Sequence, residues 1–262
     1  MIFQKRRKMV AFFCNFAQLQ FELTHFMSTS ITEKLQIFSG SVLKLIACIA
    51  MLSDHLAKFW FYRFSWANEI WFSVAGRDIS LLQLMQMFGR FAFPIFVFLL
   101  VEGFEKTKNR KKYGISLLVL ALLSEIPFNL MNGSTLLFPK QNVMFTLLLG
   151  YLAMWSLEYF KNKPLISLAL IIAMFFISRY MQADYRTAGF IFIIVMYGLS
   201  KQRVIQTLAC SMLLPMKLMV FLSLLLTCLY NGKRGFIKTP FLKYCFYAFY
   251  PVHMLVIYFL AR

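Results

Sequence analysis

The chain has 262 residues, of which 60% are hydrophobic and 18% aromatic, and its formal net charge is +18. This composition excludes a disordered chain, and the apolar runs that recur from Val42 to the C-terminus indicate a helical membrane protein. The 28 Lys and Arg residues outnumber 10 Asp and Glu and gather in short loops between the runs. Basic residues in short loops are typical of the cytoplasmic side of a membrane protein, where they set its orientation. The positive charge therefore gives no reason to expect a nucleic-acid partner.

A basic extension precedes the apolar runs. Four consecutive basic residues, Lys5–Lys8, are followed by the apolar stretch Met9–Phe13, which is too short to span a bilayer. An interfacial anchor is one interpretation, and a natural start at Met27 is an equally good one. We therefore divide the chain into an N-terminal extension, residues 1–35, and a transmembrane domain, residues 36–262.

Nine apolar segments predict an all-α, polytopic transmembrane helix bundle. In chain order they are Ser41–Tyr62, Met85–Phe104, Tyr113–Met131, Asn142–Phe160, Leu165–Tyr180, Thr187–Leu199, Val204–Leu214, Met216–Tyr230 and Phe241–Leu260. Segments seven and eight are short, and Pro215 leaves open whether they form one kinked helix. Nine spans with a cytoplasmic N-terminus place most Lys and Arg on the inner side, whereas merging two spans would move the Lys233–Lys243 cluster outside. We expect a multi-pass protein of the cytoplasmic (inner) membrane, with the lipid bilayer as its surroundings.

The longest predicted connection, Arg63–Leu84, contains Trp66 and Trp71. Aromatic residues at this position are typical of an outer interfacial belt, and a lip that faces a substrate is the alternative. The five cysteines are dispersed and form no cluster with histidine, so we predict neither disulfides nor a metal site.

Four ionisable residues from four different spans lie at a similar depth: His55, Arg90, Glu125 and His253. At 1.5 Å per residue, each lies roughly 8–10 Å below the outer end of its span. Charged groups inside a bilayer are costly unless they pair or serve a site, so we expect a buried polar site at this level. Four polar residues are candidates for lining a substrate cavity at this level: Asn142, Thr146, Asp184 and His253.

The residue types at this level allow general acid–base chemistry. His55 can accept and return a proton near neutral pH. Its neighbour Asp54 points about 100° away around a helix, so Glu125 is the better candidate to orient His55. Arg90 is a candidate for stabilising a developing oxyanion. A purely structural charge network is the alternative interpretation of these residues.

Lys44 and His55 are 11 residues apart, which is almost three helical turns, so both lie on one face of the first span about 16 Å apart. A basic group at the inner end and a base in the outer half suit a long ligand that carries phosphates at one end, such as coenzyme A. The alternative is that Lys44 extends to the inner interface without binding a ligand.

A set of short segments together resembles the TraX family, whose namesake acetylates the N-terminus of a conjugative pilin. The segments are Lys44–His55, Gly89–Pro94, Ser124–Phe128, Gln141–Gly150, Ala183–Tyr185, Tyr230–Gly235 and Tyr250–His253. Their order and spacing cover about Leu43 to the C-terminus. The sequence departs from the family pattern at Asn129, where an acid is expected, and in the segment before Met27.

TraX is similar to the integral membrane acyltransferases, which carry a basic residue, ten intervening residues and a catalytic histidine in their first span. The resemblance implies that His55 is the acid–base residue and Asp54 its carboxylate neighbour. It also implies that Lys44 and Arg90 contact an acetyl-CoA donor, and that the acceptor is a pilin-like protein or an envelope glycan. We therefore expect an acetyl-CoA-dependent membrane acyltransferase. A proton-coupled transporter that uses the same histidine and carboxylates as a relay is the alternative.

Overall fold

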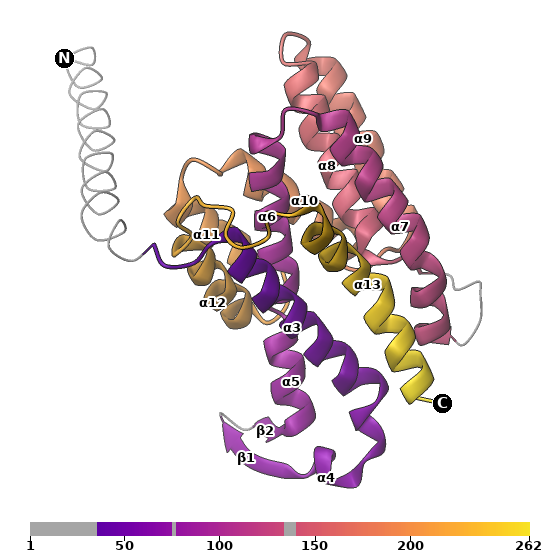
Figure 1. Ribbon diagram of the computed structural model, residues 1–262. Coiled ribbons are helices and arrows are strands. Elements are labelled where there is room, and N and C mark those ends of the chain that lie inside the picture. The colour runs from indigo at the N-terminus through magenta and orange to yellow at the C-terminus, as the bar shows by residue number, and fades with distance from the viewer. Residues whose placement is uncertain (1–35, 75–76, 134–139) are drawn as a thin grey trace, which may run out of the picture.

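The computed structural model describes residues 36–74, 77–133 and 140–262, so the N-terminal extension and the alternative start at Met27 lie outside the described residues. Within these ranges the chain is mostly helical (Figure 1). The helices are α3 (Gly40–Phe59), α4 (Ser65–Asn68), α5 (Leu81–Gly89), α6 (Ala92–Lys106), α7 (Arg110–Gly133), α8 (Val143–Tyr159), α9 (Pro164–Tyr180), α10 (Arg186–Gly198), α11 (Arg203–Ser211), α12 (Lys217–Cys228) and α13 (Pro240–Leu260), with a 3-10 turn at Phe61–Arg63. Each of the nine predicted segments is therefore helical for most of its length.

The second predicted segment is broken into two helices. Helix α5 ends with Arg90 as its C-cap, and α6 begins at Ala92. Pro94 accounts for the break, because proline has no N–H to donate and its ring clashes with the carbonyl four residues earlier, which belongs to Arg90. The seventh and eighth segments are also two helices, α11 and α12, and the turn between them contains Met216 with a φ of 54°.

The connection between the first two predicted segments contains a small antiparallel hairpin that the sequence analysis did not anticipate. Strand β1 (Ile70–Val74) pairs with β2 (Arg77–Ser80), with Phe72 opposite Ile79. Figure 1 shows this hairpin beyond the lower ends of α3 and α5. Trp66 and Trp71 are exposed there, so the aromatic side chains lie at the surface, as either an interfacial belt or a lip requires.

The core lies where α6 packs among α3, α8, α10 and α12, with α13 packed across α3 and α7 (Figure 1). The largest fully buried side chains of this core are aromatic or long apolar groups: Phe98, Phe104, Tyr151, Phe192 and Met154. Tyr151 satisfies its hydroxyl by donating to the carbonyl of Arg110, 2.8 Å away. This pairing lets a polar aromatic residue occupy the interior without an unmet hydrogen bond.

The helix α9 shows which way the apolar surfaces face. Its buried residues are Ser167 and Ser178, while Leu165 and Phe176 are 80% and 62% exposed. Each serine donates to a carbonyl three residues earlier in the same helix. A soluble protein does not display an apolar helix face of this kind, whereas a helix in lipid does, with small residues at the helix–helix contact.

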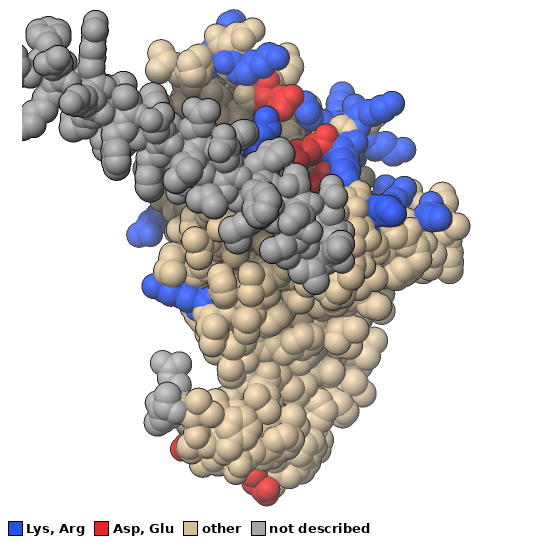
Figure 2. All heavy atoms as spheres, turned by 90° about the vertical axis from the view of Figure 1, so that its left-hand side faces the viewer, with Lys and Arg blue, Asp and Glu red and all other residues tan. Residues whose placement is uncertain are grey.

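Two described helices are long and apolar enough to cross a membrane by length and composition: residues 81–106, taken through the break, and Arg110–Gly133. Helices α8, α9, α10 and α12 are apolar but shorter. Figure 2 shows Lys and Arg side chains gathered at one end of the molecule, above a broad face with few charges. These features indicate a membrane protein, and the count of nine spans stays a prediction.

A loop from the C-terminal half closes over the start of α3. The Ser41 hydroxyl donates to the Arg234 carbonyl at 2.6 Å and accepts from the Ile237 backbone N–H at 2.9 Å. Gly235 has a φ of 87°, and a Cβ there would collide with the Ser39 side chain. Only glycine combines a favourable positive φ with the absence of a Cβ. The conformation of this loop therefore explains the glycine at the end of the segment Tyr230–Gly235.

Candidate functional site

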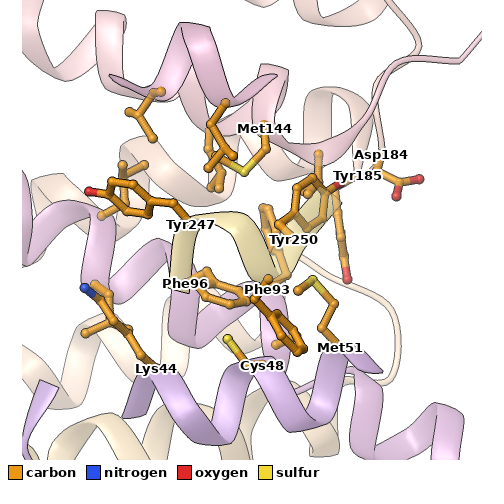
Figure 3. Close-up of a pocket in the computed structure, with 18 of the residues that line it drawn as sticks. Lys44, Cys48, Met51, Phe93, Phe96, Met144, Asp184, Tyr185, Tyr247 and Tyr250 are labelled. Carbon is orange, nitrogen blue, oxygen red and sulfur yellow. The ribbon is translucent and has the colours of Figure 1, made fainter. Parts of the chain in front are cut away.

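A cavity of about 1000 Å³ runs between α3, α6, α7 and α13. Its size lies at the upper end of the range for ligand pockets. Figure 3 shows Lys44 and Tyr247 toward one end of this cavity and Asp184 toward the other, with aromatic and methionine side chains between them. The cavity is therefore long, with an apolar middle and polar ends.

Helix α3 supplies one wall with a single face. Its lining residues include Lys44, Cys48, Met51, His55 and Lys58, which recur at the three- and four-residue spacing of one helical face. Lys44 and His55 thus line the same cavity, as the 11-residue spacing predicted. At 1.5 Å per residue, their positions on the helix are about 16 Å apart.

The end of the cavity beside Lys44 is basic. The lining side chains there include Arg234, from the loop that closes over α3, and Lys243, from the first turn of α13. Both lie within electrostatic range of Lys44. Lys106, another lining residue, pairs with Glu102 at 2.6 Å and donates to the Gly232 carbonyl at 2.7 Å. This end of the cavity therefore suits an anionic group, and Lys106 holds the loop in place.

His55 meets a second histidine. Its Nδ1 lies 2.8 Å from Nε2 of His253 on α13, and Nδ1 of His253 lies 2.7 Å from the Phe249 carbonyl oxygen. His253 is buried and is not among the cavity-lining residues, whereas His55 is. The sequence analysis placed His253 at the same depth but expected it to line the cavity. The structure instead places it behind His55.

Asp54 sits where two helices approach closely. A Cβ on Gly89 would collide with the Asp54 side chain, so glycine is required at this crossing of α3 and α5. The Asp54 carboxylate pairs with Lys58 on its own helix, and its buried Oδ1 has no hydrogen-bond partner among the described residues. Asp54 lines the cavity beside His55 without bonding it.

Arg90 reaches the cavity from the break between α5 and α6. Its side chain interacts electrostatically with Tyr185, a residue in the turn before α10 with a φ of 65°. The Tyr185 ring stacks on Phe93 with centroids 3.9 Å apart. Burial raises the pKa of Tyr185 to about 12, so its hydroxyl stays protonated and can donate a hydrogen bond at neutral pH. The sequence analysis missed this residue, although it follows Asp184 directly in one of the family-like segments.

Glu125 bonds Asn142 and not His55. Its Oε2 accepts from the Asn142 side-chain N–H at 2.5 Å and from the Asn142 backbone N–H at 3.4 Å. Asn142 caps α8 by accepting from the Met144 backbone N–H at 3.0 Å. Neither Glu125 nor Asn142 lines the cavity. Glu125 was expected to contact His55, and the residue that does so is His253.

Thr146 and Asp184 are linked through the turn before α10. The Thr146 hydroxyl donates to the Asp184 backbone carbonyl at 2.8 Å, and the Asp184 backbone N–H donates to the Gln141 carbonyl at 3.2 Å. Asp184 lines the cavity, whereas Thr146 does not. Thr146 therefore positions the turn that carries Asp184 and Tyr185 into the cavity.

Known proteins resemble this chain along most of its length. The family model described as TraX protein matches residues 39–261, which include every residue of the cavity discussed above. A probable fimbrial assembly protein FimC, serogroup H1, of Dichelobacter nodosus is 30% identical over 246 residues, which cover 83% of this chain and 93% of that protein. No solved structure matches.

Proposed function

Because this chain belongs to the TraX family, we propose that it is a multi-pass membrane acyltransferase that transfers an acetyl group from cytosolic acetyl-CoA to an amine or hydroxyl group. The proposed acceptor is a pilin-like protein or an envelope glycan, since the matched relative is named as a probable fimbrial assembly protein. The proposed location is the cytoplasmic membrane, with the basic end of the molecule facing the cytosol.

One observation carries this proposal: Lys44 and His55 line one continuous cavity from opposite ends of one helix face. The donor is long and carries its phosphates far from its thioester. Lys44, Arg234 and Lys243 would hold the phosphates at the basic end by charge-assisted contacts. The apolar middle of the cavity suits the pantetheine arm, which would bring the thioester toward His55.

The chemistry at His55 is direct transfer. His55 takes the proton from the acceptor N–H or O–H while the acceptor's electron pair forms a bond to the thioester carbonyl carbon. Arg90 and the Tyr185 hydroxyl stabilise the negative charge on the carbonyl oxygen of the tetrahedral intermediate. The intermediate then releases the coenzyme A thiolate, which recovers the proton from His55. The products are the acetylated acceptor and free coenzyme A.

The test measures transfer of labelled acetyl from acetyl-CoA in purified membranes, with the parent compared to His55→Ala and His55→Gln at equal expression. Lys161→Gln is the control, because Lys161 is exposed in the turn after α8 and is absent from the cavity lining. We expect label to reach protein or glycan with the parent and the control only. Equal transfer by His55→Gln would overturn the role of His55. Proton-gradient-dependent flux in sealed vesicles without acetyl transfer would support the transporter instead.

A further inference from the structure

His253 is bonded in a way that fixes where its own proton lies. A backbone carbonyl can only accept, so the 2.7 Å contact with the Phe249 oxygen requires a proton on Nδ1 of His253. In the neutral ring, Nε2 then has no proton and offers a lone pair. The partner that faces this lone pair is Nδ1 of His55, 2.8 Å away.

The same reasoning carries over to His55. Because Nε2 of His253 accepts, Nδ1 of His55 must donate and therefore carries the ring proton. Nε2 of His55 is then the basic atom. The two ring planes are 8° apart with centroids separated by 5.0 Å, the arrangement of two rings joined edge to edge through one N–H···N bond.

Aromatic side chains hold this pair in place. The Phe249 ring lies 4.9 Å from the His253 ring at an interplanar angle of 14°, and the Tyr250 ring lies 5.9 Å away. The Phe59 ring meets His55 edge-on at 6.2 Å. His253 is 6% exposed, so bulk water does not compete for its lone pair. The hydrogen bond to His55 is thereby sheltered.

We propose that His253 is a positioning residue that holds His55 in the tautomer protonated at Nδ1, so that Nε2 of His55 serves as the base of acyl transfer. This inference rests on the proposed function for its catalytic meaning, although the tautomer itself does not. Nε2 of His55 takes the acceptor's proton and later returns it to the departing thiolate, while Nδ1 keeps its proton throughout. The lone pair of His253 stabilises the imidazolium that forms between these steps.

Two amide substitutions at His253 separate this role from packing. The Gln side chain is long enough to bring an amide oxygen near the position of the His253 Nε2 atom, whereas the Asn side chain ends near the position of Nδ1. His253→Gln therefore keeps an acceptor within reach of His55, in competition with its own amide N–H. His253→Asn keeps the contact with Phe249 and loses the contact with His55.

The first measurement reads the tautomer without any substrate. The chain has three histidines, so ¹⁵N-histidine labelling of a His25→Gln background leaves the rings of His55 and His253. At a pH where both rings are neutral, we expect both to be protonated at Nδ1. We expect the fraction of His55 in this tautomer to fall in the order parent, His253→Gln, His253→Asn. A His55 ring protonated at Nε2 in the parent would overturn the proposal, as would an unchanged His55 signal in His253→Asn.

The second measurement is acetyl transfer by the same three proteins. We expect kcat to fall in the same order, by about 10- to 100-fold for His253→Asn, as when a group that orients a functional histidine is removed. KM for acetyl-CoA should stay constant, because the basic end of the cavity is untouched. Equal kcat in all three proteins would overturn the positioning role. The expected tautomers without acetyl transfer by the parent would reject the proposed function alone.

Discussion

The Glu125 carboxylate and the Asn142 side-chain amide are joined by a hydrogen bond of 2.5 Å that links the C-terminal half of α7 to the start of α8. Asn142 is fully buried and also donates to the Ala121 carbonyl at 3.0 Å. Two residues that the sequence offered as catalytic and substrate-lining candidates thus form a helix–helix contact. The turn that carries Asp184 is bonded to Gln141, the residue next to Asn142, so this contact also supports the wall of the cavity at Asp184.

Replacing Asn142 by Ala should destabilise the protein by about 3 kcal/mol, since the change removes a helix cap and takes the side-chain donor away from the half-buried Glu125 carboxylate, which keeps only weaker contacts such as the one with the backbone N–H of residue 142. Glu125→Gln should cost less, because the glutamine oxygen still accepts from Asn142. The measurement is thermal unfolding in detergent, with Asn68→Ala as the control. Asn68 is an exposed residue whose amide also bonds backbone carbonyls. Equal losses at positions 68 and 142 would contradict the structural role.

The depth of these residues along their helices is easier to predict from the sequence than their pairing. Sequence position predicts a similar depth for His55, Glu125 and His253, because the rise of a helix is constant. It did not fix which of them face one another, since the rotation of each helix about its axis depends on packing with its neighbours. The pairing of His55 with His253 and of Glu125 with Asn142 therefore needed the tertiary structure.

Relationships within one helix were more predictable. The shared face of Lys44 and His55 follows from the helical repeat alone, and the structure confirms it. The helices themselves follow from the apolar runs. The break at Arg90 has a sequence signal in Gly89 and Pro94. The β1–β2 hairpin carried no clear sequence signal, because the β1 side chains are all exposed and, apart from Ser73, all apolar, so the strand lacks the alternation of polar and apolar residues.

Gly89→Ala should destabilise the crossing of α3 and α5. The added Cβ would overlap the Asp54 side chain, and relieving such an overlap typically costs about 1–3 kcal/mol. The shift also moves the residue next to His55, so acetyl transfer should fall along with stability. Gly198→Ala, at the end of α10, is a matched control because a Cβ there meets nothing within 4 Å.

Thermal unfolding in detergent and acetyl transfer by the same preparations test this prediction. The control should be as stable as the parent or slightly more stable, since replacing glycine restricts the unfolded chain. A Gly89→Ala protein with the stability of the parent would show that α3 and α5 separate easily. The close approach of Gly89 to Asp54 would then contribute nothing to the free energy of unfolding.

Lys44→Ala should weaken donor binding and leave the chemical step intact. Loss of one charge-assisted contact to a phosphate should raise KM for acetyl-CoA by about tenfold with little change in kcat. Inhibition by adenosine 3′,5′-bisphosphate, which carries only the phosphate-bearing end of the donor, should weaken by a similar factor. Lys111→Ala is the control, because it removes the same charge from the start of α7 outside the cavity lining.

Steady-state kinetics with purified protein separate the two parameters. A change in kcat with constant KM for Lys44→Ala would contradict a role at the phosphate end. Equal effects of the two lysine substitutions would assign the effect to net charge at the basic end of the molecule. Neither result would bear on the tautomer of His55.

The proposed orientation predicts opposite accessibility for the two ends of α9. The turn before this helix contains Asn162 between two lysines, and the turn after it contains Gln182; both residues are exposed. In a cysteine-free background, Gln182→Cys should react with a membrane-impermeant maleimide in intact cells, because its turn faces outward. Asn162→Cys should react only after the membrane is opened, since the lysines hold its turn in the cytosol. Labelling of both cysteines in intact cells would mean that α9 does not cross the membrane, and labelling of Asn162→Cys alone would reverse the orientation of the cavity.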